Sequence, residues 1–214
     1  MTEQQMPKMM GALVEFQGGF RDLSEEEGQW VIQKTADAVA VMRAAVEKAY
    51  AEINQLLHFL GTVTILATTT KFIARDKFVV NTDDDASVKI SGFWGSFREW
   101  FLDKVEDPIA EQTLRYAKLR KASVDGPIVD ELGGKEKAET TLAEIYDLMA
   151  KQGKGQKGVL LTNGYANIFY VKDVNGVLRA VSVHWYDGGW LLYASALERP
   201  FGWLAGSQAF SRSN

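Results

Sequence analysis

Histidine, the side chain that most often carries out acid and base chemistry near neutral pH, occurs only as His58 and His184. They are far apart in the sequence, and their spacing gives no sign of a shared metal, so we predict no metal site. His58 lies beside the apolar stripe of a predicted helix, where a hydrogen-bonded imidazole is the usual outcome. If the protein is an enzyme, we expect His184 to be its acid or base.

The glycines at positions 153, 155 and 158 spell GxGxxG, the pattern of a dinucleotide-binding loop. Such a loop leaves a strand and enters a helix, whose N-terminus binds the phosphates. Here the glycines follow a predicted helix and precede a predicted strand, which favours a flexible basic connector. The pair Gly134-Lys135 lacks the first glycine and the hydroxyl residue of a phosphate loop. We therefore predict no nucleotide cofactor.

Asp83, Asp85 and Ser87 alternate like the start of a calcium loop. No glycine follows at the turn position and no glutamate closes the loop, so a solvated turn is favoured. The chain has no cysteine, which excludes disulfides, thiolate ligands and cysteine nucleophiles. No GxSxG or HExxH motif is present either. These absences favour a non-enzymatic protein without a cofactor.

Three dipeptides suited to tight turns recur every twelve residues: Asn163-Gly164, Asn175-Gly176 and Asp187-Gly188. Both residues of each pair tolerate positive φ, so we predict two-residue hairpin turns. The segment from about 157 to 198 is therefore predicted to be an antiparallel four-stranded β-meander. After Pro200, glycines are expected to turn the chain so that Trp203 and Phe210 fold back onto the edge of this sheet.

Two-residue turns also set which residues face each other across the meander. Tyr170 should lie opposite Val181, and Trp185 opposite Trp190. By alternation, one face is plainly apolar and the other is mixed. The mixed face is either a second buried face, covered by a helix over 135–152, or a ligand-binding surface with flat apolar rings and polar groups. Its candidate ligand-binding residues are Asn167, Phe169, Ser182, His184 and Tyr193.

A long helix is predicted over about 25–60. Ser24 and Glu27 have the spacing of a capping box, which starts a helix. Apolar residues then repeat every seven positions, as in a coiled coil. Because the flanking positions are also apolar, the alternative is a helix packed along its own domain or in a bundle. The candidate residues for an oligomer face are Ile32, Val39, Met42, Val46 and Ile53.

The middle of the chain gives a mixed pattern. Strands are expected over 62–69, 77–82 and 87–91, followed by an aromatic-rich helix that starts near Phe93. The sequence thus predicts an α+β protein with a long N-terminal helix, a mixed middle segment and a C-terminal antiparallel four-stranded β-meander packed against helices. We divide it into an N-terminal helical segment, 1–60, and an α+β domain, 61–214.

Composition limits the partners. The formal net charge of the 214 residues is -4 and the basic residues are dispersed, so no nucleic-acid partner is expected. The first residues lack the basic and apolar pattern of a signal peptide, and the uncharged stretch 53–70 contains too many polar residues for a membrane span. We therefore expect a cytoplasmic protein without a membrane partner.

Several stretches resemble predicted proteins of an uncharacterised bacterial family. They are the segment from about Asp125 to Glu139, LLTNGYANIFYV, the GVLR that follows, the two tryptophans Trp185 and Trp190, and the FSR near the end. The resemblance covers roughly the C-terminal 150 residues. It implies a bacterial, intracellular origin and no particular activity.

The sequence therefore favours a binding or assembly protein that acts through the heptad helix or the mixed sheet face. Its partner is then a second copy of the chain or another protein. The alternative is a small-molecule enzyme with His184 as its acid or base.

Overall fold

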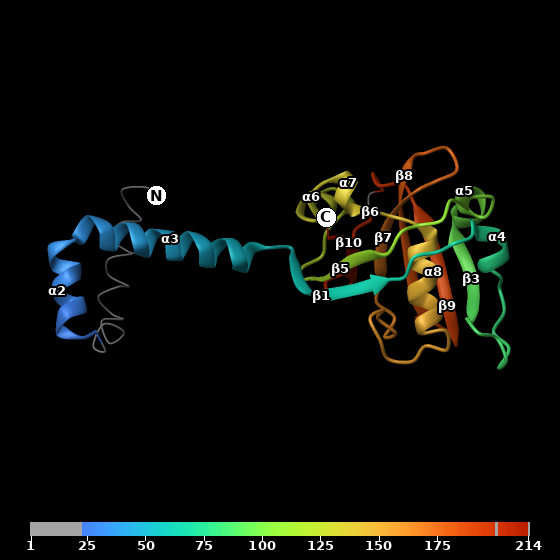
Figure 1. Ribbon diagram of the computed structural model, residues 1–214, viewed down its shortest axis with the longest axis horizontal. Coiled ribbons are helices and arrows are strands. Elements are labelled where there is room, and N and C mark those ends of the chain that lie inside the picture. Colours follow the sequence, from blue (N-terminus) through green and yellow to red (C-terminus); the bar gives the residue numbers. More distant parts are fainter. Residues whose placement is uncertain (1–22, 200, 214) are drawn as a thin grey trace. The chain divides into compact units, whose positions relative to one another are not determined.

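The computed structural model describes residues 23–199 and 201–213, and the chain divides into two compact units, 1–54 and 55–214 (Figure 1). The helices are α2 (Glu25–Gln33), α3 (Thr35–Asn54), α4 (Ala74–Lys77), α5 (Phe97–Phe101), α6 (Asp125–Glu131), α7 (Lys135–Ala138) and α8 (Leu142–Lys151). The strands are β1 (Leu57–Ile65), β2 (Phe72–Ile73), β3 (Ile90–Gly95), β4 (Val105–Glu106), β5 (Gln112–Leu119), β6 (Glu139–Thr140), β7 (Asn167–Lys172), β8 (Leu178–Tyr186), β9 (Gly189–Ser195) and β10 (Gln208–Arg212). We call residues 55–214 the sheet domain.

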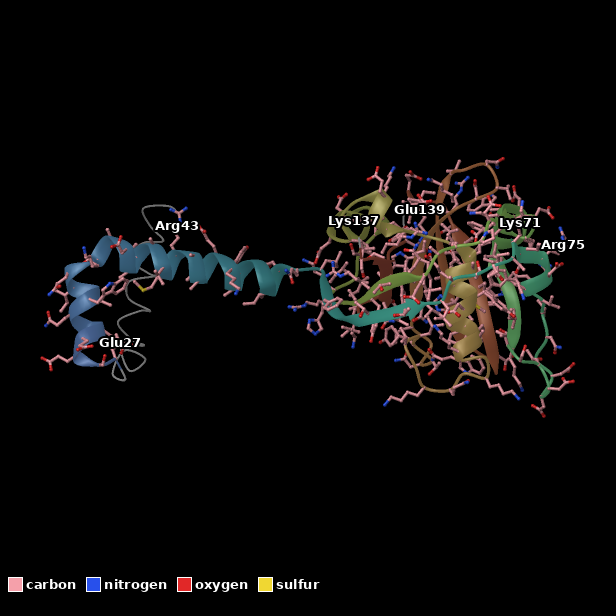
Figure 2. All side chains as sticks on the ribbon, viewed as in Figure 1. Glu27, Arg43, Lys71, Arg75, Lys137 and Glu139 are labelled. Atoms are coloured by element: carbon pink, nitrogen blue, oxygen red, sulfur yellow. The ribbon has the colours of Figure 1, made fainter. Side chains whose placement is uncertain are left out.

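In the described part of the N-terminal unit, residues 23–54, two helices stand where the sequence predicted one. Ser24 and Glu27 form the predicted capping box at the start of α2. The helix then breaks at Lys34, whose backbone is not helical, and α3 begins at Thr35. On α3, Arg43 (labelled in Figure 2) pairs with Glu47 one turn further along, at 2.8 Å. The prediction of one long helix over 25–60 is therefore wrong.

The end of that predicted helix belongs to the sheet. Residues 57–60 lie in β1, and Leu56 and Leu57 are buried in a core of the sheet domain. The two carboxylate oxygens of Glu131 accept hydrogen bonds from the backbone N–H groups of Leu56 and Leu57, both at 2.9 Å. The heptad pattern failed here because apolar residues at helical spacing also suit a strand that is buried at its start.

The main sheet is mixed and has eight strands in the described chain, in the order β1-β5-β10-β7-β8-β9-β3 with β6 also paired to β7. Antiparallel pairing joins β7, β8 and β9, whereas β10 and β6 run parallel to β7 and β3 runs parallel to β9. The predicted antiparallel four-stranded meander is therefore wrong. Asn163-Gly164 lies in a loop rather than between two strands, and β10, expected at an edge, lies inside the sheet.

The register of the meander is correct at one turn and wrong at the other. Asp187 and Gly188 both have positive φ and form a two-residue turn, so Trp185 pairs with Trp190 as predicted. At the other hairpin, the N–H of Asp173 donates to the carbonyl of Val177, which leaves a three-residue loop, 174–176. The extra residue shifts the register by one, and Tyr170 pairs with Ala180 instead of Val181.

Both faces of the sheet are covered by apolar cores. Helix α8 packs on one face, where Figure 1 shows it crossing in front of the strands, and α6 and α7 contribute to the core of the other. The predicted helix over 135–152 is in fact α7, β6 and α8, because Thr141 caps a new helix through its own capping box. Phe93, which was predicted to start a helix, lies in β3, and the aromatic helix is the short α5.

Candidate functional site

A cavity of about 500 Å³ opens on the face of β8 and β9 that carries His184. We call it the His184 cavity. Ser182 and His184 come from β8, Tyr193 from β9, and the loop before β7 and the segment before β10 complete the walls. The full lining consists of Asn163, Gly164, Tyr165, Ala166, Ser182, His184, Tyr193, Arg199, Gly202, Trp203, Leu204 and Ser207.

Ser182 and His184 form a hydrogen-bonded pair on one face of β8. The Oγ of Ser182 lies 3.0 Å from Nε2 of His184, and Nδ1 of His184 lies 3.3 Å from the carbonyl oxygen of Gly164. A carbonyl can only accept, so Nδ1 carries the proton and the neutral ring accepts from Ser182 at Nε2. Burial lowers the pKa of His184, which keeps the ring neutral at neutral pH.

Behind one wall lies a buried carboxylate, Asp125. Its Oδ1 accepts hydrogen bonds from the hydroxyl of Tyr170 at 3.0 Å and from Nε1 of Trp203 at 2.7 Å. Its Oδ2 lies 3.9 Å from Nε of Arg199, too far for a hydrogen bond. Burial raises the pKa of Asp125, and the two hydrogen bonds and Arg199 oppose that rise. Asp125 thus anchors the Trp203 wall and supplies charge beneath Arg199.

Arg199 is the cation of the cavity wall. Its guanidinium carbon lies 3.8 Å from the ring centre of Trp203 and 5.7 Å from that of Tyr193. Its Nε is buried and has no hydrogen-bond partner among the described residues. The cavity therefore combines one cation held by aromatic rings with a neutral histidine–serine pair.

Three of the five predicted ligand-binding residues meet at this cavity: Ser182, His184 and Tyr193. The structure places Asn167 and Phe169 elsewhere, because the one-residue register shift turns the other face of β7 toward the cavity side of the sheet. Asn167 is buried and hydrogen-bonds the backbone of Leu161 and Val183. Phe169 is buried in the opposite core, stacked on Phe210 with ring centres 4.4 Å apart.

The sequence did not single out Arg199 or Tyr165 as site residues. Tyr165 follows the Asn163-Gly164 pair, which was interpreted as a hairpin turn but forms a loop at the cavity. Trp203 was expected to fold back onto the edge of the sheet; it forms an isolated bridge with Ser123 and lies in the cavity wall. Arg199 carried no signal, because a single arginine next to a proline has no pattern.

The candidate residues for an oligomer face lie on two helices. Ile32 is on α2, and Val39, Met42, Val46 and Ile53 are on α3; all five side chains are exposed. The α3 positions 39, 46 and 53 keep a seven-residue spacing along one helix.

Three features within residues 23–199 and 201–213 bear on cofactor binding: the possible metal-binding groups, the second histidine and the glycine motif. No group of three histidine, aspartate or glutamate side chains in this part of the chain could hold a metal ion. His58 belongs to another cavity, where its Nδ1 accepts from Arg120 at 3.1 Å. The glycine motif serves packing: Gly155 has a φ of 72° and lies against the ring of Trp185, where a Cβ would clash.

Comparison of the chain with protein-family models, with curated proteins and with solved structures found no match. In the described part of the chain, no helix combines the length and apolar character needed to cross a membrane.

Proposed function

We propose that this protein is a non-enzymatic binding protein that takes a small organic molecule into the His184 cavity. The observation that carries the proposal is the convergence of polar and aromatic side chains from distant segments on one opening of about 500 Å³. Ligand sites in proteins have this size and this combination of apolar walls with a few placed polar groups. Tyr165, Tyr193, Trp203 and Leu204 supply the apolar area, and Arg199 and His184 are polar groups of the lining that are not fully buried.

Binding is favoured over catalysis by the surroundings of His184. A histidine base is commonly oriented by a carboxylate, which also stabilises the charged ring. Here Nδ1 faces a backbone carbonyl, and none of the described residues that line the cavity is a carboxylate. Ser182, which would be the nucleophile, is completely buried. Because both ring nitrogens of His184 already have partners within the protein, the pair suits formation of the cavity wall better than proton transfer.

A fragment screen by ligand-detected NMR tests this proposal. We expect ring compounds with polar substituents to bind the wild-type protein and to be weakened by Tyr165→Ala, which removes an exposed aromatic wall. Tyr186→Ala is the matched control, because Tyr186 is also exposed but lies at the β8–β9 turn outside the cavity. Equal weakening by both variants, or no binding of any fragment, would contradict the proposal.

Catalysis by His184 is the second candidate, favoured by the 3.0 Å contact between Ser182 Oγ and Nε2. It predicts that a bound compound is chemically changed over time and that His184→Gln stops the change while binding persists. NMR follows the bound compound over time. If the wild-type protein leaves the compound chemically unchanged, the result supports binding without catalysis.

Self-assembly through α3 is a separate candidate, favoured by the exposure of Val39, Val46 and Ile53, whose side chains are 52%, 67% and 74% exposed. β-branched residues at this spacing favour paired helices. The expected result is a mass that rises with concentration in sedimentation experiments and falls to that of a monomer in the double variant Val39→Asp, Val46→Asp. A wild-type chain that remains monomeric at all concentrations overturns this candidate.

A further inference from the structure

We propose that the occupant of the His184 cavity is a flat organic monocarboxylate, whose carboxylate pairs with Arg199 and whose ring lies among Trp203, Tyr193 and Tyr165. This inference rests on the proposed function, because it names the chemical class of the ligand for the same cavity. It begins from Arg199, a cation whose surroundings in the protein leave its hydrogen-bonding capacity unused.

The side chain of Arg199 is only 16% exposed, and it lies against the face of Trp203. Its guanidinium has five N–H donors, yet no described residue accepts a hydrogen bond from it. Asp125 attracts it from 3.9 Å without a hydrogen bond. Nε is the only guanidinium nitrogen of Arg199 that is fully buried, so the terminal nitrogens are free to take an acceptor from outside the protein. Because Arg199 lines the cavity, a ligand can be that acceptor.

The geometry of the acceptor follows from the guanidinium. Its planar fork binds two oxygens side by side, which a carboxylate or a phosphate provides. The guanidinium of Arg199 lies over the ring of Trp203, with 3.8 Å between its carbon and the ring centre, and this contact limits the orientations that an oxyanion can take. A lysine at this position would keep the charge but lose this planar fit.

The charges around Arg199 favour one negative charge over two. Arg199 is the only cation among the described residues that line the cavity, and His184 is neutral because burial lowers its pKa. Asp125 lies behind Arg199, and Glu198 is near enough to Asp125 to affect it electrostatically. A doubly charged phosphate group would meet more repulsion from these carboxylates than a carboxylate group meets.

The remaining walls fit a ring. Trp203, Tyr193 and Tyr165 present aromatic surface, and Leu204 adds apolar surface that is largely exposed. Aromatic rings pair favourably with one another in stacked or edge-to-face arrangements. A ring that carries a carboxylate thus matches both halves of the cavity.

The test compares benzoate with benzamide, its neutral counterpart of nearly the same shape, by titration calorimetry or NMR at pH 7.5. We expect benzoate to bind wild type at least about tenfold more tightly than benzamide, because it adds charge-assisted hydrogen bonds. Arg199→Gln should bring benzoate to the affinity of benzamide, and Arg199→Lys should give an intermediate value. Arg98→Gln is the matched control, since Arg98 also lies over an aromatic ring, Phe93, outside the cavity.

The outcomes separate the two proposals. Benzamide that binds as tightly as benzoate, or benzoate binding that Arg199→Gln leaves unchanged, overturns the carboxylate inference while ligand binding in the cavity stands. Tighter binding of phenyl phosphate overturns the preference for a single charge. If neither ring compound binds, the carboxylate inference fails, and the proposed function fails with it only if the fragment screen also finds no ligand. Thermal melting of each variant checks its fold. If Arg199→Gln is unfolded, the carboxylate inference is tested by the ratio of benzoate to benzamide affinity in the wild type and by the affinities of Arg199→Lys.

Discussion

Helices α2 and α8 begin with the same capping box but lie in contrasting surroundings. In α2 the backbone N–H of Ser24 donates to Glu27 Oε2 at 2.8 Å, and in α8 the N–H of Thr141 donates to Glu144 Oε2 at 2.7 Å. Glu27 is exposed, whereas Glu144 is completely buried and lies 3.4 Å from a guanidinium nitrogen of Arg212. One local motif therefore starts a solvated helix in one unit and a buried helix in the other.

The apolar residues of the two units show the same contrast. On α8, Leu148 is 1% exposed and packs in the core of the sheet domain. On α3, which follows α2, Val46 is 67% exposed. Both residues belong to apolar stripes at helical spacing. The spacing thus predicts which face of a helix is apolar, but only tertiary contacts decide whether that face is covered.

The largest expected effect is a difference in stability between matched substitutions in the two apolar stripes. Leu148→Ala should lower the free energy of unfolding of the sheet domain by about 2–5 kcal/mol, because it removes buried methyl groups and leaves a cavity. Val46→Ala, the matched change on α3, should alter it by less than about 0.5 kcal/mol. Urea denaturation followed by tryptophan fluorescence measures both.

The contrast between the two helices would be wrong if Val46→Ala lowered the free energy of unfolding as much as Leu148→Ala. Such a result would mean that Val46 is buried in solution, which points to a second chain against α3. The cost should then depend on protein concentration, because association stabilises only the assembled form.

Much of the local structure could be predicted from the sequence. The capping box at Ser24 and the turn at Asp187-Gly188 depend on neighbouring residues alone, and both are present. The strand that follows Leu56 could not be predicted, because it depends on contacts with distant segments. Leu57, for example, is held by Glu131 from α6. The Thr141–Glu144 box was visible in the sequence and would have divided the predicted helix correctly.

The candidate site was predicted only in part, because local signals indicate some of its residues and distant segments supply the others. The shared face of Ser182, His184 and Tyr193 was predicted from the alternation of side chains along β8 and β9, because the turn between these strands was predicted correctly. Asn167 and Phe169 depended on the length of the other hairpin loop, and one extra residue reversed their faces. Arg199 comes from an irregular segment after the sheet, where no periodicity indicates a neighbour.

The second effect concerns the caps themselves. Thr141→Ala should destabilise the sheet domain by about 1 kcal/mol, because it leaves the N–H of Glu144 without its partner at the start of a buried helix. Ser24→Ala should leave unfolding of the sheet domain unchanged and reduce only the helical signal in far-ultraviolet circular dichroism. A loss of sheet-domain stability in Ser24→Ala equal to that in Thr141→Ala would show that the two units unfold together.

The smallest effect is a pH dependence of opposite sign at the two boxes. The hydrogen bonds from Ser24 lower the pKa of Glu27, whereas burial raises the pKa of Glu144, although Arg212 and the capping hydrogen bonds oppose that rise. The capping interaction of Glu27 therefore stabilises α2 above the ordinary pKa of glutamate, about 4.3, and this stabilisation is lost as the pH falls further. Because the pKa of Glu144 is raised, the folded state holds a proton on this carboxyl group more tightly than the unfolded state does. The contribution of Glu144 to the stability of the sheet domain therefore declines as the pH rises from about 4.3.

Glutamine variants test these signs, because glutamine keeps a capping side chain without titrating. Glu144→Gln should gain stability relative to wild type as the pH rises from 4 to 7, in urea unfolding of the sheet domain. Below about pH 4.3, wild type should lose helical signal relative to Glu27→Gln. If Glu144→Gln instead loses relative stability as the pH rises, the attraction of Arg212 outweighs the cost of burying the carboxylate. The buried box would then resemble the exposed one in its electrostatics, and only the covering of the apolar stripe would distinguish the two helices.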